Sequence, residues 1–274
     1  MGGIRRGALP ALSALLAFTP PRLRCRCFDA KSIVNRLRCR HFISPRSPPS
    51  TAPPTSHLSI VPTLLAQTLQ PGDFAVDATC GNGHDTQTLL SCCGSSGHVV
   101  AIDVQEEAIK ATRERLHLDS RSSVTFFNGN HRDLSIVDKT LLKWSGDTSL
   151  HDGSVLSEDG FAQGGAVKAW VYNLGYLPGS DRSITTQTAD TVASLRGAQM
   201  RTARGGLVCV TVYVGHEGGK EEADAVRAEM ASWDQAVWRV VEHRPLNWPR
   251  SPILYSAHRF VMPRKKLPKR NDPF

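Results

Sequence analysis

Asp77-Ala-Thr-Cys-Gly-Asn-Gly83 is the stretch of sequence that decides the fold. The stretch begins at the end of a short apolar run, Phe74 to Asp77, which predicts a buried strand. A helical pattern from His84 to Leu90 comes directly after it. A glycine-rich turn between a strand and a helix lets a ligand approach the backbone and meet the free N–H groups of the helix start. The stretch therefore predicts a cofactor site, and a tight turn that binds nothing is the simpler alternative.

An acidic residue closes the next predicted strand, Val99 to Asp103. A dinucleotide-binding turn would read Gly-x-Gly-x-x-Gly, but Thr86 stands where the third glycine would allow close packing around a pyrophosphate. S-adenosylmethionine has no pyrophosphate, and its ribose hydroxyls can donate to a carboxylate at this strand end. We therefore expect S-adenosylmethionine rather than a dinucleotide, with Asp103 and Gln105 near its ribose or adenine. Asp103 as a plain helix cap is the alternative.

The other expected cofactor contacts lie in the turn and after the third strand. Asp85 would also be expected in a first helical turn from the helix dipole alone. Asn130 and His131 follow the third strand, where this architecture usually borders an adenine, although both residue types are common in turns. The full predicted cofactor set is Asp77, Gly81, Asn82, Gly83, His84, Asp85, Asp103, Gln105, Asn130 and His131.

Helix and strand patterns alternate from His57 onward, which predicts a layered α/β domain. We expect a class I, Rossmann-like methyltransferase fold with a mainly parallel seven-stranded sheet and a C-terminal antiparallel hairpin around Asn247-Trp248-Pro249. The interval from Leu141 to Gly165 is expected to be a loop or insertion. The predicted helices are Leu58 to Leu69, His84 to Leu90, Glu106 to Leu116, Thr188 to Arg201 and Glu221 to Trp233, and the strands Phe74 to Asp77, Val99 to Asp103, Val124 to Phe127, Ala166 to Tyr172, Gly206 to Val214, Val237 to Arg244 and Ile253 to Phe260.

Asn173-Leu-Gly-Tyr176 stands at the end of the predicted fourth strand. Because the carboxyl ends of strands one and four lie on the same rim of such a sheet, this loop should face the cofactor's methyl group. Its order is similar to the Asn-Pro-Pro-Tyr loop of methyltransferases that modify nitrogen, where the asparagine amide oxygen accepts amine hydrogens and the aromatic ring stacks on the base. A Gly-Pro turn with a buried asparagine is the alternative.

Catalysis at such a site would consist mainly of positioning, since a sulfonium already carries an activated methyl group. An alkylamine resembles lysine, with a pKa of roughly 10 in water, so it must become neutral before it attacks. Asp181, Tyr176 and His216 are candidates for the group that takes its proton. The predicted catalytic residues are Asn173, Tyr176 and Asp181, and the predicted substrate-binding residues are Leu174, Gly175, Arg182, Ser183 and His216.

These motifs together resemble a bacterial and plant family once labelled putative rRNA methylase, over about His57 to Phe260. Its members are tRNA 5-aminomethyl-2-thiouridine methyltransferases that act on the wobble uridine. The resemblance implies N-methylation of the 5-aminomethyl group, tRNA as partner, a possible homodimer, and cofactor contacts at Asn82, His84, Asp103, Gln105, Asn130 and His131. The resemblance rests on the motifs 77-DATCGNGHDT-86, 102-IDVQ-105, 172-YNLGYLPG-179, 183-SITT-186 and 213-YVGHEGGK-220. The chain departs from the family at Asn130-His131-Arg132, where the family often has Ser-His-Asp.

Positive charge is concentrated in the first 56 residues, which hold 10 of the 33 basic and only one of the 25 acidic residues. This Arg- and Ser-rich segment predicts an organellar transit peptide, with a secretory signal as the alternative because Arg5 and Arg6 precede an apolar run. The predicted organisation is a transit peptide over 1–56, a methyltransferase domain over 57–262 and a basic tail over 263–274. We expect an organellar location, with the chloroplast favoured over the mitochondrion.

Several classes of protein are disfavoured by the composition. No apolar run reaches the roughly 20 residues that span a bilayer, so no membrane association is expected. The seven cysteines are odd in number and lack zinc-ligand spacing, which predicts neither a disulfide framework nor a metal site. The alternatives to a tRNA methyltransferase are an rRNA or small-amine N-methyltransferase and a non-catalytic RNA-binding scaffold of the same fold.

Overall fold

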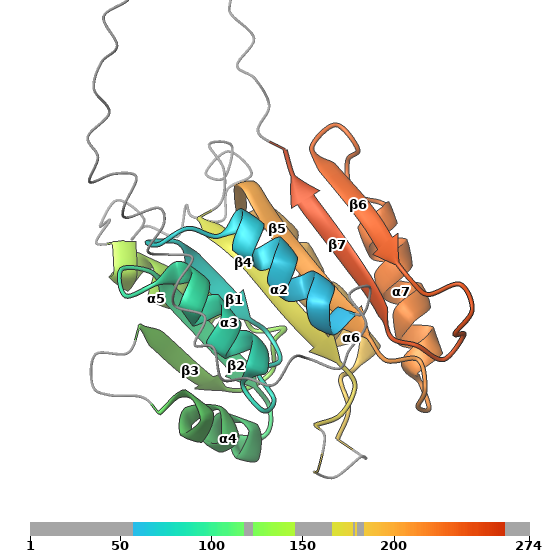
Figure 1. Cartoon of the computed structure of the whole chain (residues 1–274), viewed down its shortest axis with the longest axis horizontal. Coiled ribbons are helices and arrows are strands. Elements are labelled where there is room, and N and C mark those ends of the chain that lie inside the picture. The colour runs from blue at the N-terminus through green and yellow to red at the C-terminus, as the bar shows by residue number, and fades with distance from the viewer. Residues whose placement is uncertain (1–56, 118–122, 146–165, 178, 180–183, 261–274) are drawn as a thin grey trace, which may run out of the picture. The chain divides into compact units, whose positions relative to one another are not determined.

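The protein is described by a computed structural model, in which residues 57–117, 123–145, 166–177, 179 and 184–260 are placed. A seven-stranded sheet with the order β3-β2-β1-β4-β5-β7-β6 runs through it (Figure 1). The first five strands are mutually parallel, and β7 is antiparallel to both of its neighbours, which confirms the predicted sheet and its C-terminal hairpin. The strands are β1 (Phe74–Asp77), β2 (His98–Asp103), β3 (Val124–Asn128), β4 (Val167–Leu174), β5 (Thr202–Val212), β6 (Trp238–His243) and β7 (Ile253–Arg259).

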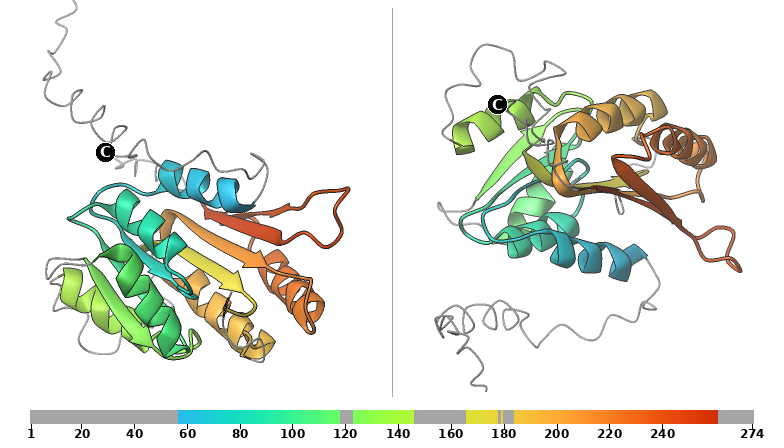
Figure 2. Two further views of the ribbon diagram at one scale, coloured as in Figure 1. Left: turned by 60° about the horizontal axis from the view of Figure 1, so that its bottom comes forward. Right: turned by 90° about the horizontal axis from the view of Figure 1, so that it is seen from above.

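Helices cover both faces of the sheet (Figure 2). One face carries α2 (His57–Thr68), α3 (His84–Cys93) and α4 (Glu106–Leu116), and the other carries α5 (Ser135–Ser145), α6 (Thr188–Arg201) and α7 (Gly219–Ala231). The inner strands β1, β2, β4 and the second half of β5 are therefore buried on both sides, which explains why they read as nearly continuous apolar runs, whereas the edge strands β3 and β6 are partly exposed.

Alternate residues of β4 build the two halves of the core. Trp170 and Tyr172 pack in the layer that includes α5, α6 and α7, whereas Ala169 and Val171 pack beneath α2 and α3. The large and small side chains follow the two-residue period of a strand. This central strand therefore anchors both layers and carries the Asn173 loop at its carboxyl end.

The segment before the predicted insertion differs from expectation. Helix α5 takes up the first five residues of the interval from Leu141 to Gly165 that was predicted to be a loop, and residues 146–165 lie outside the described part. Leu134, Val137 and Leu141 are buried at helical spacing, and the Asp133 carboxylate accepts the Ser135 N–H at 3.0 Å at the helix start. The polar residues that follow obscured this short apolar pattern.

The predicted transit peptide and basic tail also lie outside the described residues. Within the described part, no helix is long and apolar enough to cross a membrane. The four cysteines placed there, Cys80, Cys92, Cys93 and Cys209, are all free thiols.

Gly83 is required by the packing of the first turn. Its φ is +81°, in the left-handed region, and a Cβ atom would lie 2.9 Å from the Cα atom of Thr112 on α4. Neither the backbone of the turn nor that of α4 can yield without moving a helix. Only glycine therefore fits between β1 and α3.

We predict that Gly83→Ala lowers the free energy of unfolding by at least about 1–3 kcal/mol, because a non-glycine residue in this backbone region is strained before any clash is counted. Urea unfolding of the full chain measures the change. Gly215→Ala is the matched control, since its added Cβ meets nothing within 4 Å and its φ is not positive. Equal stability of the two variants would contradict this account of the turn.

Candidate functional site

A cavity of about 940 Å³ opens at the carboxyl ends of the parallel strands. The turn after β1, the ends of β2, β4 and β5, the loop after β3, helix α2 and the β6–β7 loop all contribute to its wall. Among the predicted residues, it is lined by Gly81, Asn82, His84, Asp85, Asp103, Gln105, Asn130, His131, Asn173, Leu174, Gly175, Tyr176 and His216.

Five predicted site residues do not line the cavity as it is described. Asp181, Arg182 and Ser183 lie outside the described residues. Asp77 and Gly83 are buried behind the wall rather than on it. The structure therefore gives the last two a supporting position beneath the turn instead of a surface that a cofactor could touch.

Asp77 joins the turn to helix α3 from below. Its carboxylate accepts the Thr86 hydroxyl at 2.5 Å and the Thr79 N–H at 3.3 Å, and it is fully buried. Burial first, and the nearby Asp85 carboxylate second, raise the pKa of Asp77 to about 8. Thr86, the residue in place of a third glycine, thus supplies a hydroxyl that a buried carboxyl group needs.

Asp103 holds the other side of the turn. One carboxylate oxygen accepts the Gly81 N–H and the other accepts the Gln105 N–H, each at 3.0 Å. The Thr112 hydroxyl also donates to the Gly81 carbonyl at 2.9 Å, which ties the turn to α4. Burial raises the pKa of Asp103, and its backbone hydrogen bonds oppose that shift. A carboxylate offers about four lone-pair sites, so Asp103 retains capacity for two further donors such as a pair of hydroxyls.

Asn173, near the end of β4, is held by two residues that follow the neighbouring strand β1. Its side-chain Nδ2 donates a short hydrogen bond to the Asp85 carboxylate, and its backbone N–H donates to the Thr79 hydroxyl at 2.6 Å. The amide NH₂ therefore faces Asp85. The amide oxygen is then the group that Asn173 can offer to a ligand. Burial raises the pKa of Asp85, while the hydrogen bond from Asn173 opposes that rise.

A buried carboxylate on α7 supports the loop after Asn173. The Gly175 N–H donates to the Thr186 hydroxyl at 3.0 Å, and that hydroxyl donates to Glu222 at 2.8 Å. Thr191 donates to the other oxygen of Glu222 at 2.9 Å, and the Thr186 N–H returns to the Gly175 carbonyl at 2.9 Å. The loop conformation is therefore fixed by a chain of hydrogen bonds that ends on a side chain 2% exposed.

His216 lies against this loop, and its hydrogen-bond partner shows which ring nitrogen carries the hydrogen. Its Nδ1 is 2.8 Å from the Glu217 carbonyl oxygen, which can only accept, so Nδ1 carries the hydrogen. In the neutral ring, Nε2 is then an acceptor. That atom is buried and has no hydrogen-bond partner among the described residues, and a Cβ built on Gly175 would lie 3.3 Å from it. The ring also meets Tyr176 edge-on, with centroids 5.9 Å apart.

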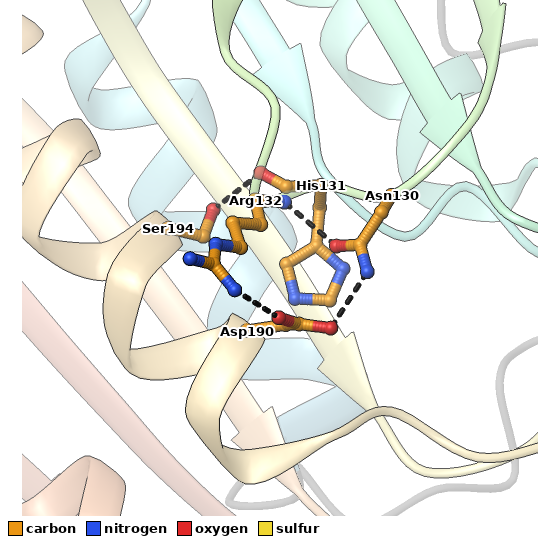
Figure 3. Close-up of polar contacts among 5 residues, drawn as sticks. All are labelled: Asn130, His131, Arg132, Asp190 and Ser194. Atoms are coloured by element: carbon orange, nitrogen blue, oxygen red, sulfur yellow. Dashed lines mark hydrogen bonds and ion pairs between the residues drawn. The ribbon is translucent and has the colours of Figure 1, made fainter.

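The loop after β3 is tied to α6 through Asp190 (Figure 3). Asn130 Nδ2 donates to Asp190 at 2.7 Å, and Arg132 Nη1 contacts the other Asp190 oxygen at 3.3 Å. The Asn130 amide oxygen accepts the Arg132 N–H at 2.8 Å, and Ser194 donates to the His131 carbonyl at 2.8 Å. Arg132 thus has a partner in Asp190, and both ends of the Asn130 amide are occupied.

His131 presents a neutral ring to the cavity wall. The side chain is buried, and burial lowers its pKa to about 4 despite the opposing charge of Asp190. Its Nε2 has no hydrogen-bond partner within the described ranges. A buried ring nitrogen without a partner is costly to leave unpaired, so this atom marks a place where a ligand group could bind.

Four residues that support the site were not predicted from the sequence: Thr79, Thr186, Asp190 and Glu222. Thr79 and Thr186 stand within the motifs quoted above, which is the only signal that pointed toward them. Asp190 and Glu222 occur in first helical turns, where an acidic residue is expected from the helix dipole alone. In the part of the chain that the structure covers, no group of three His, Cys, Asp or Glu side chains could hold a metal ion.

Comparisons with known proteins agree with this architecture. A family model described as putative rRNA methylase matches residues 99–259. A chloroplastic tRNA (mnm(5)s(2)U34)-methyltransferase from Arabidopsis thaliana is 32% identical over 197 residues, which are 69% of this chain and 64% of the relative. This chain therefore accounts for somewhat less than two thirds of that relative's length.

Two bacterial crystal structures are similar over nearly their whole length. A putative rRNA-methylase from Clostridium thermocellum is 29% identical with a TM-score of 0.61, covering 75% of this chain and 98% of its own. A putative methyltransferase from Streptococcus mutans, in complex with SAH, is 28% identical with a TM-score of 0.58, covering 74% and 97%.

Proposed function

Because the chain belongs to the putative rRNA methylase family, we propose that it is an S-adenosylmethionine-dependent methyltransferase that acts on tRNA. The proposed reaction is N-methylation of the 5-aminomethyl group of (2-thio)uridine at the wobble position, which gives the 5-methylaminomethyl nucleoside. The name of the Arabidopsis relative supports the substrate, and the SAH complex of the Streptococcus mutans relative supports the cofactor.

The observation that carries this proposal is the locked amide of Asn173. Asp85, in the first turn of α3, holds its NH₂ group, and Thr79, in the turn that follows β1, holds its backbone N–H. The amide oxygen, for which no partner is found among the described residues, suits an amine, whose hydrogens need an acceptor while its lone pair faces the methyl group. Because attack on a sulfonium methyl requires little covalent assistance, alignment of this kind is the main service the protein can give.

The described residues fit the proposed cofactor. Asp103 retains lone pairs for a ribose diol, His131 offers an unpaired ring nitrogen on the wall, and the turn of Gly81 leads into the N-terminus of α3. A cavity of about 940 Å³ is large enough for a cofactor and a nucleoside together. When bound, S-adenosylmethionine supplies an activated methyl group, and these side chains bind and orient it.

The amine must lose a proton before it reacts, and His216 is the residue that the structure supports for this role. The hydrogen bond from its Nδ1 to the Glu217 carbonyl leaves Nε2 as an acceptor beside Gly175. Tyr176 stacks edge-on against the same ring and would border the base. Asp181, the third candidate, lies outside the described residues.

An organellar location is also part of the proposal. Residues 1–56 are rich in arginine and serine and contain a single acidic residue, which is the composition of a transit peptide. The Arabidopsis relative is named as chloroplastic, which supports an organellar location, and the chloroplast is the organelle proposed.

We predict that purified protein transfers a methyl group from S-adenosylmethionine to tRNA that carries 5-aminomethyluridine at position 34. Nucleoside mass spectrometry would show the aminomethyl nucleoside converted to its methylaminomethyl form. The control is the same tRNA made as an unmodified transcript, which lacks the amine and should accept no methyl group. Methylation of the transcript, or of rRNA, would instead support the alternative substrate.

A second prediction separates the orientation of Asn173 from the charge of Asp85. We expect Asp85→Ala to lower kcat on the order of 100-fold, because the amide loses the acceptor that orients it. We expect Asp85→Asn to retain most of the activity, since its side-chain oxygen can still accept from Asn173. Calorimetry of S-adenosylmethionine binding separates this effect on orientation from a lost cofactor contact, because Asp85 is also in the predicted cofactor set. An Asp85→Asn protein as inactive as Asp85→Ala would mean that the negative charge itself is needed.

A further inference from the structure

The loop between β6 and β7 exposes apolar side chains between two arginines. Leu246 is fully exposed and Trp248 is 61% exposed, although such large side chains are usually covered. Arg244 and Arg250 flank them and are also exposed, and residues 244–252 contain no acidic residue. The loop thus combines an aromatic surface with positive charge.

This loop lies at the rim of the cavity. Ile253, the first residue of β7, pairs with Val212, the last residue of β5, so the loop leaves the sheet at the carboxyl ends of the parallel strands. Figure 1 shows it at the end of the sheet to which the arrowheads of β4 and β5 point. Arg250 and Pro252 contribute to the cavity wall itself. A polymer with one residue in the cavity would therefore pass along this loop.

The conformation of the loop is restrained even though its tip is exposed. The Ser251 N–H donates to the Trp248 carbonyl at 3.0 Å, and Arg244 donates to the Pro249 carbonyl at 3.3 Å. Three prolines, Pro245, Pro249 and Pro252, restrict the backbone further. A side chain displayed on a restrained loop loses less conformational freedom on binding than one on a flexible loop.

We propose that the β6–β7 loop is a docking surface for single-stranded RNA, in which a base next to the modified nucleoside stacks on Trp248 and Arg250 contacts the phosphate backbone. The inference rests on the proposed function, because it takes an RNA nucleoside to occupy the cavity. Aromatic rings and arginines are the groups that bind unpaired nucleotides without reading their sequence.

A second copy of this chain is the competing occupant of the same surface. A two-fold contact through the loop would bring the arginines of one copy close to those of the other, with no acidic residue in residues 244–252 to neutralise them. A polyanion, by contrast, matches their charge. The charge of the loop therefore favours RNA.

Substitutions of Trp248 test the proposal in the full chain with an anticodon stem-loop RNA. We expect Trp248→Ala to raise Kd and KM for RNA at least about 10-fold, with kcat at saturating RNA unchanged. Trp248→Phe should bind nearly as wild type, and Trp248→Leu should be as weak as the alanine variant because it has no ring to stack. Arg250→Gln should weaken binding and reduce its salt dependence. The control is Trp144→Ala, a partly exposed tryptophan that contacts Phe74 at the opposite end of the strands.

The outcomes separate this proposal from the proposed function. If the wild type methylates tRNA and Trp248→Ala binds the RNA equally well, the docking surface is wrong and the function stands. If the wild type transfers no methyl group but its RNA binding still depends on Trp248, the function is wrong and the surface stands. If Trp248→Ala changes the mass measured by light scattering, the loop is a contact between copies of the chain and the proposal is wrong. If Trp248→Leu binds RNA as well as the wild type does, stacking of a base on Trp248 is wrong.

Discussion

The hydrogen bond between Asn173 and Asp85 is the constraint on which the rest of the site depends. It joins the end of strand β4 to the start of helix α3, which follows the adjacent parallel strand β1, and the register of the two strands sets Asp77 beside Val171. A second hydrogen bond, from the Asn173 backbone N–H to the Thr79 hydroxyl, joins β4 to the turn directly after β1. Since one of these two segments is the expected place of the cofactor and the other that of the acceptor amine, a movement of either would displace both reactants.

Buried carboxyl groups support this junction from two sides. Asp77 receives the hydroxyl of Thr86 beneath the first turn, and Glu222 receives those of Thr186 and Thr191 behind the second. Burial raises the pKa of both acids, because removing a carboxylate from water costs free energy. The hydrogen bonds from the threonine hydroxyls reduce that cost. Such groups stabilise a fold poorly, but they determine one geometry, because a buried hydroxyl or carboxyl group tolerates few arrangements.

Local patterns in the sequence predicted the parts of the site that depend on single strands. Gly81, Gly83 and Asp103 could be found because a turn with positive φ needs glycine and a strand end exposes its last side chain. The mainly parallel sheet and its C-terminal hairpin followed from the alternation of elements, whereas the strand order came only from the structure. Glu222 and Asp190 could not be found, because their partners lie 36 and 60 residues away and an acid at a helix start has a local explanation. Helix α5 was missed because its last turn was assigned to the polar stretch that follows, although Val137, Leu141 and Trp144 recur at helical spacing.

A double-mutant cycle on Asp85 and Asn173 tests the central claim most directly. The rate of methyl transfer at saturating S-adenosylmethionine and tRNA would be measured for the wild type, Asp85→Ala, Asn173→Ala and the double variant. If Asp85 acts by orienting Asn173, its removal costs rate only while Asn173 is present, so the double variant is as active as Asn173→Ala alone. If Asp85→Ala reduces the rate by the same factor in both backgrounds, the two residues act independently and the coupling of the two segments is not what positions the amine.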